Sequence, residues 1–436
     1  MLAWLFAVSF GLVSWSPALS DSGLSQRASM LEAKLIEWRR DIHQHPELSN
    51  REFRTAALVA DHLRALGMDV STDIAHTGVV GVLNPGKPGP MVALRADMDA
   101  LPVTEETGLT FASTVTASYN GQTSGVMHAC GHDAHVAILM TVAELLADIR
   151  DQLPGSVMFI FQPAEEGAPG DERGGAELML EEGIFASRIP DAIFGLHVSS
   201  VASAGVIGWH SGPFMASADR FEIVVKGRQT HGAKPWQGVD PIVVSAQIVL
   251  GLQTIASRQV DVTEAPSIVS IGAISGGIRN NIIPDQVRMI GTIRAFNETM
   301  REDIHRRIET TARGIAAAAG TEAEVVIVRQ YPVTVNDPAL VKQMLPTLER
   351  VAGDQLQEFG LITWAEDFSF YAQQAPAIFL HLGVTSPQLD PLTAPANHSP
   401  KFLIDESALL NGVLALSELT VDFLELAPAG SANRER

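Results

Sequence analysis

The stretch MHACGHDAH, residues 127–135, concentrates the residue types best able to bind metals or carry protons. Within it stand His128, Cys130, His132, Asp133 and His135. Cys130 is the only cysteine of the 436-residue chain, so it has no disulfide partner there. A lone thiol two residues from an imidazole is typical of a soft metal site. The alternative, a buried structural cysteine among scattered histidines, fits this dense spacing less well.

The apolar run AILMTVAELLADI, residues 137–149, follows this cluster with helical periodicity. The cluster is therefore expected at the N-terminus of a helix. The helix macrodipole favours anions at that end and lowers the pKa of a thiol. We therefore expect Cys130 to be easily deprotonated.

Acidic and imidazole groups also follow three apolar runs that are predicted to be strands. MVALR (91–95) and VMFIFQ (157–162) precede acids, and AIFGLH (192–197) ends in His197. Open α/β sheets place their ligands beyond the carboxyl ends of their strands. Asp97 taken alone is equally consistent with a polar turn before Pro102.

Glu165 and Glu166 are adjacent acids directly after the second of these strands. One carboxylate of such a pair can bind a metal while the other acts as general base. The candidate set, in chain order, is Asp99, Cys130, His132, Glu165, Glu166, His197 and His398. Mixed sulfur, nitrogen and oxygen donors suit Mn, Zn, Co or Ni better than Ca or Mg. The set predicts a hydrolase with two divalent metal ions.

Length and charge restrict the class of protein further. A chain of 436 residues is too long for one compact core, and 46% hydrophobic residues indicate a well-packed globular protein. The net charge of −20 argues against nucleic acid and anionic membrane surfaces as partners. A small anionic substrate stays possible, because a single well-placed arginine could hold it.

Residues 1–20 are predicted to be a signal peptide. The apolar segment MLAWLFAVSFGLVSW is too short to span a bilayer, and Ala18 and Ser20 offer small residues for cleavage after Ser20. We therefore expect export to the periplasm or the medium, and no membrane partner after cleavage. The segment lacks a Lys or Arg before its apolar core, so a retained membrane anchor is the alternative.

The chain is predicted to be a two-domain α/β protein. Between about 219 and 331 the patterns alternate as β-α-β-β-α-β, which matches the ferredoxin-like arrangement. We assign residues 213–330 to an inserted small domain, and 21–212 with 331–436 to a catalytic, metal-binding domain.

Many ordered motifs resemble those of the M20 metallopeptidase family, in particular its amidohydrolase branch of hippurate hydrolases, N-acyl-amino-acid amidohydrolases and auxin-conjugate hydrolases. They include RRDIHQHPELS (39–49), RADMDALP (95–102), MHACGHDAHVA (127–137), FQPAEEG (161–167), GLHV (195–198), THGAKPWQGVDPI (230–242), NIIPD (281–285), GTIR (291–294), EDFSFYA (366–372) and NHSPKF (397–402). The resemblance covers nearly the whole chain after the leader. It implies a zinc-peptidase-like α/β catalytic domain with an inserted ferredoxin-like lid or dimerisation domain.

The resemblance also implies roles for single residues. It implies metal ligation by Cys130, His132, Glu166, His197 and His398. Glu165 becomes the catalytic acid/base, and Asp99 takes the place of an aspartate that orients a ligand. His231 is similar to a lid histidine that reaches the substrate carbonyl, often from a neighbouring subunit. Asn281 and Arg294 resemble residues that hold the substrate carboxylate.

The expected activity is metal-dependent hydrolysis of the amide bond in N-acyl amino acids (hippurate-like or N-acetylated) or in small peptides, by a homodimer. Two alternatives from other classes are a thiol hydrolase with Cys130 as nucleophile and a non-catalytic binding protein. The Cys-x-His spacing counts against the first, because triad partners normally come from separate parts of a fold. The intact Glu165–Glu166 pair counts against the second.

Overall fold

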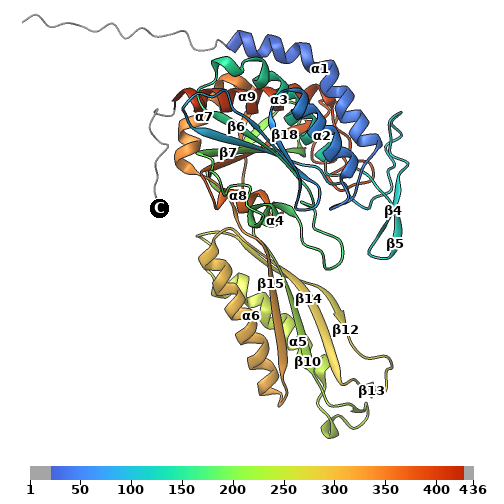
Figure 1. Ribbon diagram of the computed structural model, residues 1–436. Helices are drawn as coiled ribbons and strands as arrows, with labels where there is room; N and C mark the ends of the chain where they lie inside the picture. Colours follow the sequence, from blue (N-terminus) through green and yellow to red (C-terminus); the bar gives the residue numbers. More distant parts are fainter. Residues whose placement is uncertain (1–20, 427–436) are drawn as a thin grey trace, which may run out of the picture.

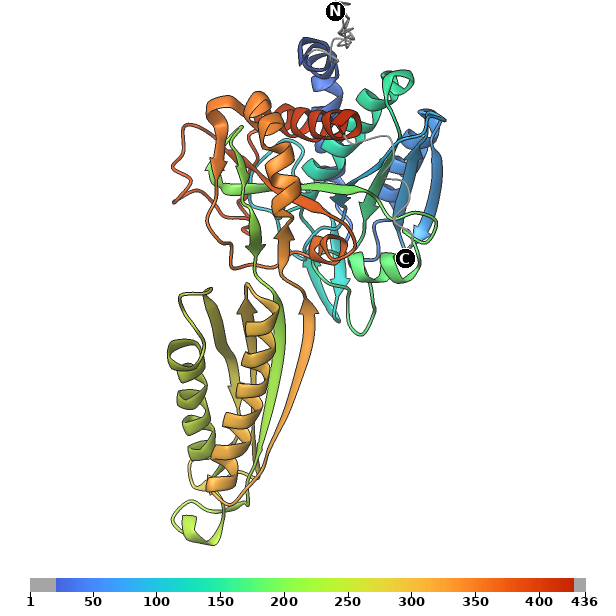
Figure 2. The same cartoon turned by 90° about the vertical axis from the view of Figure 1, so that its left-hand side faces the viewer.

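The computed structural model describes residues 21–426 of the chain (Figure 1). The predicted signal peptide and its cleavage site after Ser20 lie outside the described residues. A large domain is built on an eight-stranded sheet, and a smaller domain on a four-stranded sheet projects from it (Figures 1 and 2). The predicted two-domain α/β class is confirmed.

The large sheet has the order β1-β2-β6-β3-β7-β18-β8-β17. Its four central strands, β6, β3, β7 and β18, run parallel. The strands are β1 (Asp69–Ile74), β2 (Gly78–Leu83), β3 (Met91–Asp97), β6 (Ser156–Gln162), β7 (Ala192–Ser203), β8 (Ile207–Trp209), β17 (Leu356–Glu358) and β18 (Ala377–Thr385). A small hairpin of β4 (Thr116–Tyr119) and β5 (Gln122–Gly125) lies outside this sheet.

Helices cover both faces of the large sheet (Figure 1). One face carries α1 (Asp21–Gln44), α2 (Phe53–Ala65), α3 (His132–Asp148), α7 (Pro338–Ala352) and α9 (Leu409–Leu426), and the other carries α4 (Gly175–Glu181) and α8 (Phe368–Ala372). Along β3, Val92 and Leu94 join the core under the first layer, while Met91 and Ala93 join the core under the second. This double burial explains why the central strands are continuous apolar runs.

The stretch Glu406–Leu426, which includes α9, is long and apolar enough by composition to cross a membrane. Within the protein, however, 72% of its apolar window is buried. The helix packs against α1, α3 and α7, so it is a core helix of the large domain.

The small domain has the sheet order β12-β14-β10-β15, with every neighbouring pair antiparallel. Its elements are β10 (Ala218–Lys226), α5 (Pro241–Thr254), β12 (Ser267–Ser275), β14 (Gln286–Ala295), α6 (Glu298–Ala318) and β15 (Ala323–Tyr331). This is the predicted ferredoxin-like order. Both helices cover the same face of the sheet, where Ile223, Met289 and Ile304 are fully buried (Figure 2).

Two short strand pairs mark the two ends of the small domain. β9 (Gly212–Met215) pairs with β16 (Thr334–Asn336) where the chain passes between the domains. β11 (Thr230–His231) pairs with β13 (Ile282–Ile283) at the opposite end (Figure 1). The boundaries at 213 and 330 stay predictions, while the four-stranded sheet itself runs from Ala218 to Tyr331.

Candidate metal centre and active site

A tight turn before α3 brings Cys130 and His132 to the carboxyl edge of the sheet. Gly131, between them, has φ = 97°, a left-handed conformation that favours glycine. A Cβ atom at Gly131 would lie 2.3 Å from a methyl group of Val198. The glycine in the Cys-Gly-His sequence is therefore required both by the backbone and by the contact with β7.

The other predicted metal ligands come from three separate segments. Glu166 follows β6, His197 lies in β7, and His398 lies in the loop before α9. His197 was expected to end its strand, but β7 continues to Ser203 because β18 still pairs with it beyond this point. Pairing of β7 with β3 stops at Gly195, two residues before His197.

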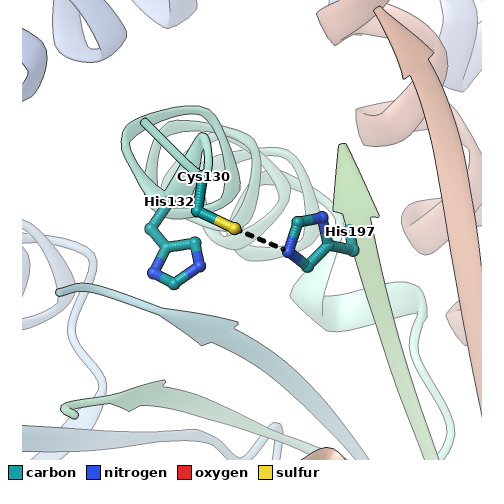
Figure 3. Close-up of side chains that lie close together, drawn as sticks. All are labelled: Cys130, His132 and His197. Atoms are coloured by element: carbon teal, nitrogen blue, oxygen red, sulfur yellow. Dashed lines mark hydrogen bonds between the residues drawn. The ribbon is translucent and has the colours of Figure 1, made fainter. Parts of the chain in front are cut away.

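The five predicted ligand side chains gather around the sulfur of Cys130. Its Sγ lies 3.3 Å from Nε2 of His197 (Figure 3) and 3.3 Å from Nε2 of His398. Nε2 of His398 lies 3.0 Å from a carboxylate oxygen of Glu166. Cys130 belongs to two groups whose ligand atoms lie within 4.8 Å of one another, one with His132 and His197, the other with Glu166 and His398.

The chemistry of His132 fits a bound cation. Its Nδ1 lies 3.2 Å from a carboxylate oxygen of Asp99, while its Nε2 is buried with no hydrogen-bond partner among the described residues. Burial opposes charge on the ring, yet Asp97 and Asp99 raise the pKa of His132 to about 10. The acids therefore attract positive charge to this ring, and a divalent cation at Nε2 can replace the proton. The donor set suits Mn, Zn, Co or Ni.

The prediction that Cys130 is easily deprotonated is wrong for the protein alone. Burial, followed by the negative charges of Glu166 and Glu165, raises the pKa of the thiol well above its usual range. The partial positive charge of a helix N-terminus does not offset complete burial beside two carboxylates. A cation bound among the five donors would supply the charge that a thiolate needs, whereas a free thiol here is a poor nucleophile.

Replacing Cys130 with serine should weaken metal binding and activity together. A hydroxyl of similar shape is a poor ligand for a soft metal. Metal affinity should therefore fall at least 10- to 100-fold, the loss that is typical when a group that only contacts a metal ligand is replaced. Metal content of the purified variant, measured by mass spectrometry, checks this. Cys130→Asp, which restores an anionic donor, should retain more metal. An unchanged metal content in Cys130→Ser would contradict the ligand assignment.

Asp99 holds the site together without facing the cavity. Its buried carboxylate accepts hydrogen bonds from the backbone N–H groups of Glu165 (3.1 Å) and Glu166 (3.0 Å) and from the hydroxyl of Ser49 (2.8 Å). The same carboxylate contacts His132. Burial opposes the effect, but the hydrogen bond from His132 keeps the pKa of Asp99 below its usual value. Asp99 therefore fixes the backbone of the acidic pair and the orientation of the His132 ring.

Two non-glycine residues at the site have left-handed backbone conformations. Ala164, just before the acidic pair, has φ = 53°, and His398 has φ = 71°. Such residues are strained, and strain of this kind collects at functional sites. Tyr331 donates from its hydroxyl to the carbonyl of Glu165 at 2.8 Å, which helps to fix this loop.

A buried charge network beside the site was not foreseen. Arg95 contacts Asp97 at 2.6 Å, Asp367 at 2.7 Å and Glu366 at 2.9 Å. Asp97 is thus no simple polar turn, since its other oxygen lies 2.5 Å from Nδ1 of His135. The signal in the sequence was an arginine inside an otherwise apolar strand.

The donor cluster opens into a cavity of about 360 Å³. Glu165 lines this cavity together with Glu366 and the ligand residues Cys130, Glu166, His197 and His398. Burial, then the charges of Glu366 and Glu166, raise the pKa of Glu165 well above its usual range. A carboxyl group that holds a proton more readily than usual suits acid/base exchange with substrate.

The three active-site residues predicted on the small domain, His231, Asn281 and Arg294, do not lie together within one chain. His231 and Asn281 are adjacent, because His231 pairs with Ile282 and the N–H of Gly232 donates to the carbonyl of Asn281 at 2.8 Å. Arg294 lies at the other end of β14, near the large domain. The ten residues of β14 span about 30 Å. One chain therefore cannot use Asn281 and Arg294 on the same carboxylate.

Side chains from four segments thus form a donor cluster with a carboxyl group beside it, at the strand ends of an α/β domain that carries a ferredoxin-like domain. This fold and site define a two-domain amide hydrolase of the metallopeptidase class. Residues 93–422 match the model of peptidase family M20/M25/M40, and the chain belongs to this family.

Similar proteins span nearly the whole chain. Thermostable carboxypeptidase 1 of Saccharolobus solfataricus is 42% identical over 90% of this chain and 96% of its own length. N-acetylcysteine deacetylase of Bacillus subtilis is 37% identical over 90% of this chain and 97% of its own. The solved structure of the Bacillus subtilis YxeP protein, a dinuclear metal-binding M20 peptidase, is 35% identical with a TM-score of 0.76, covering 92% of this chain and 100% of that one. The resemblance seen in the sequence is confirmed, and the chain is a hydrolase that acts on amide bonds.

Proposed function

We propose that the protein hydrolyses the amide bond of N-acyl amino acids, such as hippurate-like or N-acetylated ones, or of small peptides. The observation that carries the proposal is the buried carboxyl group of Glu165, which shares one cavity with four of the five clustered donors. The names of the relatives, a carboxypeptidase and an N-acetylcysteine deacetylase, support substrates of this kind.

Cys130, His132, Glu166, His197 and His398 would hold two divalent cations, Mn, Zn, Co or Ni. When bound, these cations supply Lewis acidity that acidifies water and polarises a carbonyl group. Glu165, which the charge of bound cations would keep ionised, takes the proton of the attacking water on its carboxylate and passes it to the nitrogen of the departing amine. Asp99 fixes the backbone of Glu165 and the ring of His132 during this exchange.

His231 and Asn281 would complete the site from a second subunit. In their own chain they lie at the end of the small domain away from the junction with the large domain (Figure 1). β12 is an edge strand with exposed Ile274, and α5 exposes Ile242 and Leu250. Exposed edges and apolar side chains favour association. A homodimer through the small domains would combine one chain's Arg294 with the other chain's Asn281 on a carboxylate.

Arg294→Ala should raise KM about 10- to 100-fold for substrates with a free carboxylate, and much less for their amide analogues. Arg294 can make a charge-assisted hydrogen bond only to substrates that carry a carboxylate, so only these substrates lose it in the variant. Steady-state kinetics on matched acid and amide substrates checks this. Arg288→Ala on the same strand, which breaks an ion pair with Glu222, is the control and should not discriminate. Equal losses on both substrates would contradict the role of Arg294.

A chromatographic screen of N-acyl amino acids with the Mn- or Zn-loaded enzyme tests the proposed function directly. Release of free amino acid that stops with a chelator supports it. Turnover that survives chelation but stops after thiol alkylation would instead indicate a cysteine hydrolase. Export through the N-terminal segment is part of the proposal and is tested by N-terminal sequencing of the secreted protein, expected to begin at Asp21.

A further inference from the structure

His381 is a buried histidine of the cavity wall with no role in the proposed reaction. It lies on β18 directly opposite His197 in the parallel pairing of β18 with β7, so both side chains leave the same face of the sheet. The two rings stack with centroids 6.0 Å apart. His381 is 1% exposed, yet it is one of the residues that line the cavity beside the donor cluster.

Neither ring nitrogen of His381 has a hydrogen-bond partner among residues 21–426. Buried polar groups are nearly always paired, because an unpaired one loses its hydration without compensation. Its neighbours are aromatic: Phe214 at 5.2 Å, Phe359 and Phe379 at 6.1 Å, and Trp364 at 6.4 Å between ring centroids. A ring buried among aromatic side chains is favoured in its neutral form, because burial penalises the charged one.

A neutral imidazole offers one N–H donor and one nitrogen acceptor. Here both stand beside Trp364, and the apolar side chains of Met215 and Ala365 line the same cavity. Pockets of this kind bind an apolar group by burying its surface, and a small number of polar contacts fix its orientation. A ligand with a flat apolar body and one neutral hydrogen-bonding group would match this wall.

We propose that His381 is a specificity-determining residue that hydrogen-bonds a neutral polar substituent, such as a hydroxyl, on an aromatic acyl group of the substrate. The proposal rests on the proposed function. With the scissile carbonyl at the donor cluster and the amino-acid carboxylate held from the small domain, the acyl group is the part left for this cavity. The enzyme should then prefer ring-hydroxylated N-benzoyl amino acids over the unsubstituted N-benzoyl parent.

The test compares kcat/KM for N-benzoylglycine and its 2-, 3- and 4-hydroxybenzoyl analogues. In the wild type, at least one hydroxylated substrate should exceed the parent about tenfold or more, since a site built for a hydrogen bond rejects ligands that lack it. His381→Phe should abolish this preference while keeping turnover of the parent. His381→Asn, which keeps a donor and an acceptor, should retain part of it.

His210→Phe is the matched control. His210 stacks on the same Phe214 at 5.7 Å but does not line the cavity, so its variant should keep the wild-type preference. Dissociation constants of benzoate and the hydroxybenzoates, measured by calorimetry, give a second reading that needs no turnover, and should lose the same preference in His381→Phe. Absence of any hydroxyl preference in the wild type, or its survival in His381→Phe, would overturn the proposal. If no N-acyl amino acid is cleaved at all, the proposed function fails, whereas cleavage without hydroxyl preference refutes only the role of His381.

Discussion

Replacing Glu165 with glutamine should lower kcat about 10²- to 10⁴-fold, the range expected for the loss of a general acid/base. The amide has nearly the same size and shape as the carboxyl group and can still form hydrogen bonds, but it cannot accept and release a proton at neutral pH. The backbone N–H of Glu165 would still donate to Asp99, so the loop should keep its position. Metal content and thermal stability should therefore stay close to those of the wild type.

The measurement is kcat, with metal content determined on the same preparation. Glu52→Gln is a close control, because Glu52 is also buried and accepts from the N–H of Ala164, directly before Glu165. Burial and the charge of Asp99 raise the pKa of Glu52 to about 8, so the protonated form is favoured more than usual and a neutral amide resembles that form. This variant should keep most of its activity. A Glu165→Gln enzyme with near wild-type kcat would show that another group carries the proton.

His231→Ala should lower kcat about 10²- to 10³-fold with little change in metal content, as expected for the loss of one oxyanion donor. The backbone N–H of Ala233 donates to Nδ1 of His231 at 3.0 Å, which leaves the proton of the neutral ring on Nε2. The exposed ring therefore presents a donor to its surroundings. Its own metal cluster is out of reach, since β10 and β14 separate them by about 30 Å.

Mixing His231→Ala with Glu165→Gln tests whether the histidine acts across subunits. Each variant alone should be nearly inactive, but a mixed dimer would contain one site with both groups intact. After subunit exchange, activity should return to a fraction of the wild-type value. Analytical ultracentrifugation gives the oligomeric state, and two distinguishable tags verify the exchange. Verified exchange without recovered activity would place His231 in its own subunit's site or outside catalysis.

The sequence alone determined the elements and the chemistry of the site. The apolar runs at 91–95, 157–162 and 192–197 are strands, as predicted. A strand buried on both faces needs apolar residues at consecutive positions, and this pattern is visible in the local sequence. Cys130 and His132 are two residues apart in the sequence and lie close together in space, so their proximity could be predicted without knowledge of the fold. The ferredoxin-like order and the family followed from local patterns and ordered motifs.

Other properties depended on tertiary structure, because they arise from contacts between segments that lie far apart in the chain. The raised pKa of Cys130 reflects burial and two acids from another strand end, which outweigh its local position before a helix. Arg95 meets Asp367, 272 residues away, so the charge network could not be read from either segment. His381 becomes part of the cavity only through its register with His197, and His231 lies far from its own cluster because two strands extend between them. Sequence thus determined which groups are present, and long-range packing decided their protonation, their neighbours and the subunit they can serve.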